Sequence, residues 1–209
     1  MSIRRTHNTQ RRRARVLIQC EGDTEPNYLR EFRRDPRVVS HFNVTVKEGH
    51  GGDANAVISA AIAERERQRR PEDRYDHIWC VLDVEGDTRA AVLTEAIAEA
   101  RRQKFGVFLS NPCFEVWLLA HFEATSRSFS NCKATERYLK QTHWGTVSRT
   151  EYDKADPHLF RKLAERLPAA LANAQLVLEN NHRGGECQAC NSSTEVYKLI
   201  QKLLRLLPL

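Results

Sequence analysis

Four short apolar stretches alternate with helix-like segments over the first 122 residues, and this alternation constrains the fold more than any other feature. The stretches are rich in β-branched and aromatic residues, which is typical of buried strands. Strand–helix alternation of this kind predicts an α/β layer with a mainly parallel, four-stranded sheet flanked by helices. The predicted strands cover residues 16–20, 42–47, 77–83 and 106–110.

The predicted helices of this layer begin at recognisable signals. Thr24 is the expected cap of the first helix, with Pro26 in its first turn, and Asp53 is the expected cap of the second. Pro112 is expected to open a later helix. Its aromatic face indicates core packing rather than a platform for stacked bases. The predicted helices run to about residue 34 and over 54–69, 88–104 and 111–122.

The whole chain divides into four predicted parts. Residues 1–14 form a flexible basic arm, and 15–122 form the α/β core. Residues 123–158 are polar and irregular, which indicates an insertion or lobe; its mixed basic and aromatic side chains suit nucleic acid or a solvated helical face. Residues 159–209 are expected to be C-terminal helices packed on the core, with a polar turn before the last helix at 194–206.

Acidic residues follow two of the predicted strands. Asp83, Glu85 and Asp87 lie at the end of one strand, and Glu21 follows another. Side chains two apart on a strand point the same way, and ligands of open parallel sheets sit beyond the carboxyl ends of strands. If the two strands are neighbours, these acids meet. Crowded carboxylates attract a hard divalent cation, so we expect magnesium or manganese there.

Two further points bear on this acidic site. Glu115 lies early in a helix that starts at a strand's carboxyl end, where it could approach the other acids. The alternative is that acids and glycines follow strands because turns need them, with Asp87 and Thr88 only capping the next helix.

The positive charge of the chain is concentrated at its start. The net charge is +6, and six arginines precede residue 16 with no acid among them. Without them, 27 basic residues balance 27 acidic ones. Such an arm indicates contact with the phosphates of nucleic acid, or else a disordered solubilising tail. The arginines are Arg4, Arg5, Arg11, Arg12, Arg13 and Arg15.

The six cysteines are scattered, which suits reduced thiols in the cytosol better than a disulfide framework. Cys187 and Cys190 form a single C-x-x-C pair, which supplies only two of the four ligands that structural zinc requires. His182 and Cys132 could complete the set, but the spacing argues against zinc. The start of the chain lacks the apolar segment of a secretory signal, and no apolar run could span a bilayer, so we expect no membrane association.

Four segments together resemble the RloB-like proteins, a bacterial family found near restriction and abortive-infection loci. They are CEGDTEPNY at 20–28, DVE at 83–85, SNPCFEVWLL at 110–119 and NSSTEVYKL at 191–199. The resemblance implies a Toprim-like fold, shared with topoisomerases, primases and OLD-type nucleases. It also implies an ATPase partner of the AAA or ABC type encoded nearby.

The resemblance also implies roles for individual residues. Glu21 matches the Toprim glutamate, a general acid/base and possible metal contact. Asp83 and Glu85 match the two acids of the Asp-x-Asp motif that hold magnesium, with Glu85 one methylene longer than the usual aspartate. Asn111, Glu115 and Lys198 take supporting positions, and Lys198 suits a phosphate contact.

These observations lead to one expected function and two rivals. We expect a magnesium-dependent nuclease that acts on DNA or RNA as the effector of an anti-phage system. One rival is a module that binds nucleic acid or an ATPase without cutting, and the other is a nucleotide-binding protein, although phosphate fingerprints are absent. The sequence leaves the number of chains open, so an oligomer is possible.

Overall fold

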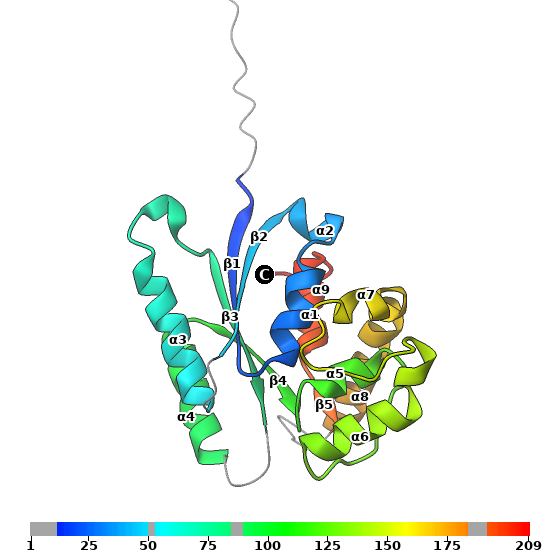
Figure 1. Ribbon diagram of the computed structural model, residues 1–209. Coiled ribbons are helices and arrows are strands. Elements are labelled where there is room, and N and C mark those ends of the chain that lie inside the picture. The colour runs from blue at the N-terminus through cyan, green and yellow to red at the C-terminus, as the bar shows by residue number, and fades with distance from the viewer. Residues whose placement is uncertain (1–11, 50–52, 85–89, 184–191) are drawn as a thin grey trace, which may run out of the picture.

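The fold is built on one five-stranded sheet, seen in the computed structural model, which describes residues 12–49, 53–84, 90–183 and 192–209 (Figure 1). The strand order is β2-β1-β3-β4-β5; the first four strands are parallel, and β5 is antiparallel to β4. The carboxyl ends of β1, β3 and β4 therefore lie at one edge of the sheet. The strands are β1 (Ala14–Cys20), β2 (Phe42–Lys47), β3 (His77–Asp83), β4 (Gly106–Asn111) and β5 (Ser193–Thr194).

The α/β prediction is confirmed, but the sheet has five strands where the sequence predicted four. The missed strand, β5, has only two residues and contains no apolar run that periodicity could detect. Thr194 pairs with Ser110 of β4, and their hydroxyl oxygens lie 2.8 Å apart. The last helix consequently begins at Val196, not at Thr194.

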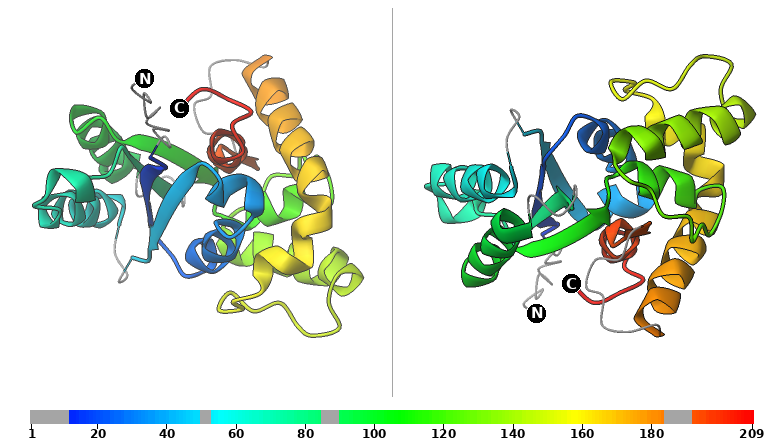
Figure 2. Two further views of the ribbon diagram at one scale, coloured as in Figure 1. Left: turned by 90° about the horizontal axis from the view of Figure 1, so that it is seen from above. Right: turned by 90° about the horizontal axis from the view of Figure 1, so that it is seen from below.

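Helices cover both faces of the sheet (Figure 2). One face carries α3 (Ala54–Arg67) and α4 (Ala90–Arg102). The other helices lie on the opposite face or beside it (Figure 1). They are α1 (Thr24–Phe32), α2 (Pro36–Val39), α5 (Glu115–Ala120), α6 (Cys132–Thr142), α7 (Leu159–Leu163), α8 (Leu167–Arg183) and α9 (Val196–Leu203), with short 3₁₀ turns at Pro71–Asp73, Trp144–Thr146 and Ala164–Arg166.

Alternation along the central strands divides the core into two parts. In β1, Val16 and Ile18 join the larger cluster with α1, α5 and α9, whereas Leu17 joins the smaller cluster with α3 and α4. In β3, Trp79 and Val81 belong to the larger cluster, so Asp83 continues that alternation toward the same side. The sheet is thus apolar on both faces, as parallel sheets require.

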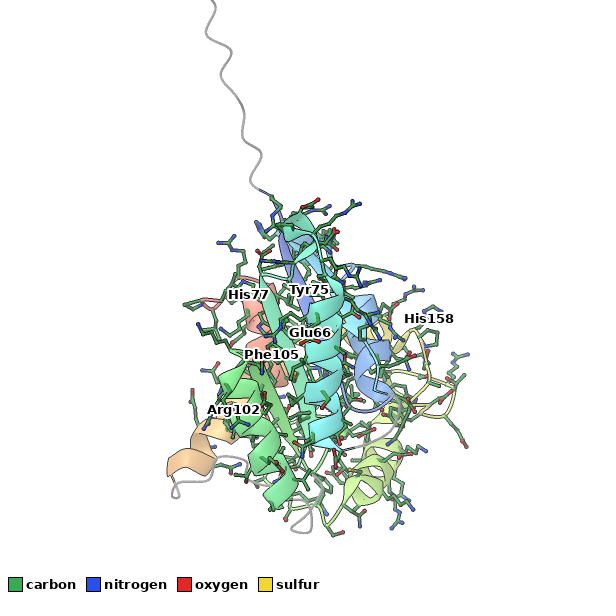
Figure 3. The ribbon with its side chains drawn as sticks, turned by 90° about the vertical axis from the view of Figure 1, so that its left-hand side faces the viewer. Glu66, Tyr75, His77, Arg102, Phe105 and His158 are labelled. Carbon is green, nitrogen blue, oxygen red and sulfur yellow. The ribbon has the colours of Figure 1, made fainter. Side chains whose placement is uncertain are left out.

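Figure 3 shows the face covered by α3 and α4. Tyr75 precedes β3 and His77 is its first residue, so both mark the amino-terminal end of this strand, near the point where β1 begins. Tyr75 donates a hydrogen bond to Glu64 of α3 at 3.2 Å, which joins this edge to the helix layer. Because β1 to β4 are parallel, their amino-terminal ends lie at one edge of the sheet and their carboxyl ends at the other, separated by the length of the strands.

Of three predicted helix starts, the structure confirms one and contradicts two. Asp53 does cap α3, because its side chain accepts the backbone N–H of Ala56. Thr24 is not a cap: it is the first residue of α1, and its hydroxyl donates to Glu115 instead. Pro112 does not open a helix either, since α5 begins at Glu115.

The segment predicted as a polar lobe contributes to the core. Four of its side chains are buried in the larger cluster together with the sheet. The predicted aromatic face of the preceding helix is also core: His121 is buried and donates through Nδ1 to the carbonyl of Trp117 at 3.0 Å. Its Nε2 therefore accepts from the hydroxyl of Tyr28 at 3.1 Å. The four side chains are Phe129, Leu139, Trp144 and Tyr152.

Candidate metal-binding site

The acids that follow β1 and β3 lie side by side. The two strands are parallel neighbours, with Cys20 opposite Val81, so Glu21 is nearly level with Asp83. An oxygen of Glu21, Oε2, accepts a hydrogen bond from the backbone N–H of Asp83 at 3.1 Å. This contact holds the Glu21 carboxylate at the carboxyl edge of the sheet, where the order of the strands predicted it.

Asp83 has a buried carboxylate oxygen that is well suited to bind a cation. Its Oδ1 atom is buried and has no hydrogen-bond partner among the described residues. Burial raises the pKa of Asp83 well above its ordinary value, and the neighbouring Glu25, Glu115 and Glu21 raise it further. Buried polar atoms are nearly always paired, so an unpaired carboxylate oxygen among other acids favours a bound cation.

Glu25 is a member of this cluster that the sequence argument did not assign to the site. It lies in the first turn of α1 and is buried, with Oε1 accepting the backbone N–H of Gly22 at 3.2 Å. Burial raises its pKa to about 7, against the effect of its backbone hydrogen bonds and with help from Glu115 and Glu21. The signal in the sequence was its position four residues after Glu21, in the first turn of the helix predicted to follow the strand.

Glu115 approaches the cluster as expected, but its charge is compensated. Its Oε1 accepts from the hydroxyls of Thr24 at 3.1 Å and Tyr152 at 3.0 Å, and it lies 3.2 Å from Nζ of Lys154. Burial disfavours the charged form of Lys154, but the Glu115 carboxylate outweighs this effect and raises the pKa of the amine. Three donors therefore hold the Glu115 side chain in place on the α-helical side of the site.

A cavity of about 250 Å³ opens beside Glu21 on the side of the sheet covered by α3. Its walls come from the carboxyl ends of β1 and β2 and from α3. The walls carry both signs of charge. Nζ of Lys47 and Nη1 of Arg67 lie 3.8 and 3.3 Å from Oε2 of Glu64. A polar ligand can therefore reach Glu21 from this side without crossing the apolar core.

The predicted arginine contacts lie at the opposite end of the sheet. Arg12 pairs with Asp76 at 2.8 Å, and Arg13 donates to the carbonyl of Val39 at 2.9 Å. Arg15 donates its backbone N–H to Asp76 at 2.7 Å. The seven residues of β1 separate this edge from Glu21, about 20 Å of extended chain.

The remaining predicted residues are placed as follows. Lys198 lies on α9 and pairs with Glu195 at 2.7 Å, and no described contact joins it to the acids. Asn111 ends β4 and its carbonyl accepts the N–H of Ser192 at 2.8 Å. Other predicted positions lie outside the described residues: Glu85, Asp87, Arg11, Cys187 and Cys190, with the side chain of His182.

The described acids fit a divalent cation. Asp83 offers a buried oxygen that no described donor reaches, and Glu21 is hydrogen-bonded to the same strand end. Carboxylate oxygens are the ligands that magnesium and manganese prefer. The roles of Glu85 and Asp87 in such a site stay predictions.

Fold and site together define a class: an α/β protein with a carboxylate cluster at the carboxyl edge of a mostly parallel sheet, compatible with a Rossmann-like or Toprim-like fold. A model of the RloB-like protein family matches residues 16–203. The chain belongs to the RloB-like family. No match was found among curated proteins or among solved structures. None of the described helices is long and apolar enough to cross a membrane.

Proposed function

We propose that the protein is a metal-dependent nuclease that hydrolyses phosphodiester bonds of DNA or RNA, and that it is the effector of a bacterial anti-phage, abortive-infection system. The observation that carries the catalytic part is the convergence of Glu21, Glu25 and Asp83 around a buried carboxylate oxygen with no partner among the described residues. The defence role in this proposal rests on the RloB-like family, whose members are found near restriction and abortive-infection loci.

Each acid has a distinct part in this proposal. Asp83 and Glu85 hold magnesium or manganese, with help from Glu21 or Asp87. The bound cation supplies charge neutralisation at the scissile phosphate and orientation of the attacking water. Glu21 exchanges the proton, and Glu25, whose pKa is raised to about 7, is a second carboxyl able to do so near neutral pH.

Nucleic acid binding in this proposal uses more than one surface. Arg12 and Arg13, the described arginines of the arm, lie at the amino edge of the sheet, and the acids lie at the carboxyl edge. The arm therefore adds sequence-independent affinity at a distance from the chemistry, by contacting phosphates. An AAA- or ABC-type ATPase encoded nearby would deliver the substrate to the nuclease or activate cleavage.

The test is cleavage of DNA and tRNA by the wild-type protein, alone and with the ATPase encoded beside it, in magnesium or manganese. General acid/base groups contribute about 10²- to 10⁴-fold, so Glu21→Gln should cut at least 100-fold more slowly than wild type. Glu64→Gln is the matched control, because Glu64 lines the adjacent cavity and pairs with Lys47 and Arg67. Equal cleavage by wild type and Glu21→Gln would contradict the proposal.

The alternative is a non-catalytic module that binds nucleic acid or the ATPase. The ion pair between Lys154 and Glu115 favours it, because a built-in amine already neutralises one acid of the cluster. This module would bind nucleic acid equally well after Asp83→Asn and in the presence of a chelator. A nuclease would lose metal-dependent cleavage under both conditions.

A further inference from the structure

Two cysteine thiols lie beside Asp83 in positions that the proposed nuclease does not use. Cys113 lies in the connection between β4 and α5, and Cys132 is the first residue of α6. A carboxylate oxygen of Asp83 and the Sγ atoms of Cys113 and Cys132 all lie within 4.8 Å of one another. Three segments far apart in the sequence therefore bring one oxygen and two sulfur ligands to a single point.

The contacts of the two thiols leave one carboxylate oxygen of Asp83 without a hydrogen-bond donor among the described residues. Cys113 and Cys132 are free thiols whose Sγ atoms lie within 4.8 Å of one another, and Sγ of Cys132 lies 3.9 Å from the carbonyl oxygen of Pro112. Oδ1 of Asp83 nevertheless stays buried and without a donor among the described residues. A thiol pair that only filled space would not explain this unpaired oxygen, whereas a cation shared by the three side chains would.

The spacing suits a small tetrahedral ion. With metal–sulfur bonds of about 2.3 Å and metal–oxygen bonds of about 2.1 Å, ligand atoms around such an ion lie about 3.6–3.8 Å apart. A set confined within 4.8 Å reaches that arrangement by a contraction of about 1 Å at most. Changes of this size need only side-chain rotation.

The ligand types select the ion. Thiolate ligands favour zinc and similar ions, whereas magnesium prefers oxygen ligands alone. Three protein ligands leave a fourth position for water or a substrate group. We propose that Asp83, Cys113 and Cys132 form a three-ligand site for a thiophilic divalent cation of the zinc class.

This site differs from the zinc arrangement that the spacing of the cysteines argued against. There, Cys132 was a distant supplement to Cys187 and Cys190, whereas among the described residues it lies beside Cys113 and Asp83. The site shares Asp83 with the proposed nuclease but does not rest on nuclease activity, because metal binding is measured directly. Failure of one proposal therefore leaves the other standing.

The experiment titrates the reduced, chelator-treated full chain with Co²⁺, followed by Zn²⁺. Wild type should develop a thiolate-to-cobalt charge-transfer band in the near ultraviolet at one equivalent, and Zn²⁺ should abolish it. Cys113→Ser and Cys132→Ala should each remove the band. Asp83→Asn should keep both thiolates but weaken Co²⁺ binding by about tenfold or more, since even outer-shell changes cost about 10- to 100-fold.

Two controls separate this site from other cysteines. Cys80→Ala removes a buried thiol of β3 that belongs to the smaller core cluster, with α3 and α4. This variant should leave the band unchanged. The double variant Cys187→Ser/Cys190→Ser should also leave it unchanged. Circular dichroism without metal checks folding, and Cys132→Ala carries the test alone if Cys113→Ser does not fold, because Cys132 is only partly buried.

Three results would overturn the proposal. The first is that wild type develops no thiolate band with Co²⁺. The second is a band that survives Cys132→Ala. The third is a band that disappears in the double variant of Cys187 and Cys190, which would place the metal at the C-x-x-C pair.

Discussion

The Oε2 atom of Glu21 accepts the backbone N–H of Asp83 at 3.1 Å, although the two residues lie 62 positions apart in the sequence. The contact exists because β1 and β3 are parallel neighbours that end at the same level. It brings a second carboxylate close to the buried Oδ1 atom of Asp83 and so creates repulsion that a cation would relieve. The stability of the fold should therefore respond to the charge of these side chains and to divalent metal.

Asp83→Asn should stabilise the metal-free protein. The change removes a buried charge that its acidic neighbours repel and keeps nearly the same shape, so the free energy of unfolding should rise by about 1–3 kcal/mol. Magnesium should stabilise the wild type and have little effect on the variant. Urea unfolding with chelator and with magnesium measures both effects. Equal magnesium stabilisation of the two proteins would show that the cation binds elsewhere.

Glu25 should make the metal-free fold less stable as pH rises. Its folded-state pKa is raised from 4.5 to about 7, so the folded protein holds this proton more tightly than the unfolded chain. The contribution of Glu25 to the free energy of unfolding should be largest below about pH 4.5. It should fall by about 1–3 kcal/mol as the pH rises from there through 7.

The check is urea unfolding of wild type and Glu25→Gln between pH 5 and pH 8 with chelator. The glutamine keeps an oxygen for the N–H of Gly22 but does not titrate, so its stability should fall less over this range. Asp83, whose pKa is also raised, should supply the slope that remains. Identical pH profiles would exclude a raised pKa at Glu25.

Lys154 should stabilise the fold through the buried Glu115. Lys154→Ala leaves that carboxylate with hydroxyl donors only, from Thr24 and Tyr152, so we expect a loss of about 1–3 kcal/mol. Adding Glu115→Gln should recover part of the loss. Lys140→Ala is the control, because Lys140 pairs with Glu136, which is also a partner of Lys154; this partly exposed pair should be worth under about 1 kcal/mol. Equal losses at Lys154 and Lys140 would show that the Glu115 contact contributes little.

The arginine arm should affect nucleic acid affinity rather than cleavage. Arg11→Ala, Arg12→Ala and Arg13→Ala together should weaken binding uniformly across sequences and lower the salt dependence by about one unit of slope for each phosphate that is no longer neutralised. Because β1 separates Arg12 and Arg13 from Glu21, cleavage at saturating substrate should change little. Arg161→Ala, which breaks a pair with Glu31, is the control. An unchanged salt slope in the arm variant would favour the solubilising tail.

Much of the sheet could be predicted because its strands are apolar runs bounded by turn residues. The predicted bounds of β2 and β3 match the structure, and Asp53 caps α3 as expected. The meeting of Glu21 and Asp83 followed from parallel strands with acids at their ends. In these cases local sequence and topology were sufficient.

Other features depended on contacts that no local pattern encodes. The sequence placed Thr24 at a cap because threonine often caps helices, but a tertiary contact with Glu115 takes its hydroxyl. The two residues of β5 form a strand only because β4 offers an edge. The importance of Glu25 depends on its burial, and that of Lys154 on its contact with the buried Glu115. The cysteine neighbours of Asp83 come from the β4–α5 connection and from the first turn of α6.

The most direct test of the central claim is a crystal of the protein soaked with Mn²⁺ and measured at a wavelength where manganese scatters anomalously. The account predicts an anomalous peak at bonding distance from a carboxylate oxygen of Asp83, with Glu21 beside it. A peak only at an exposed acid away from β1 and β3, or no peak while the acids are ordered, would contradict the account.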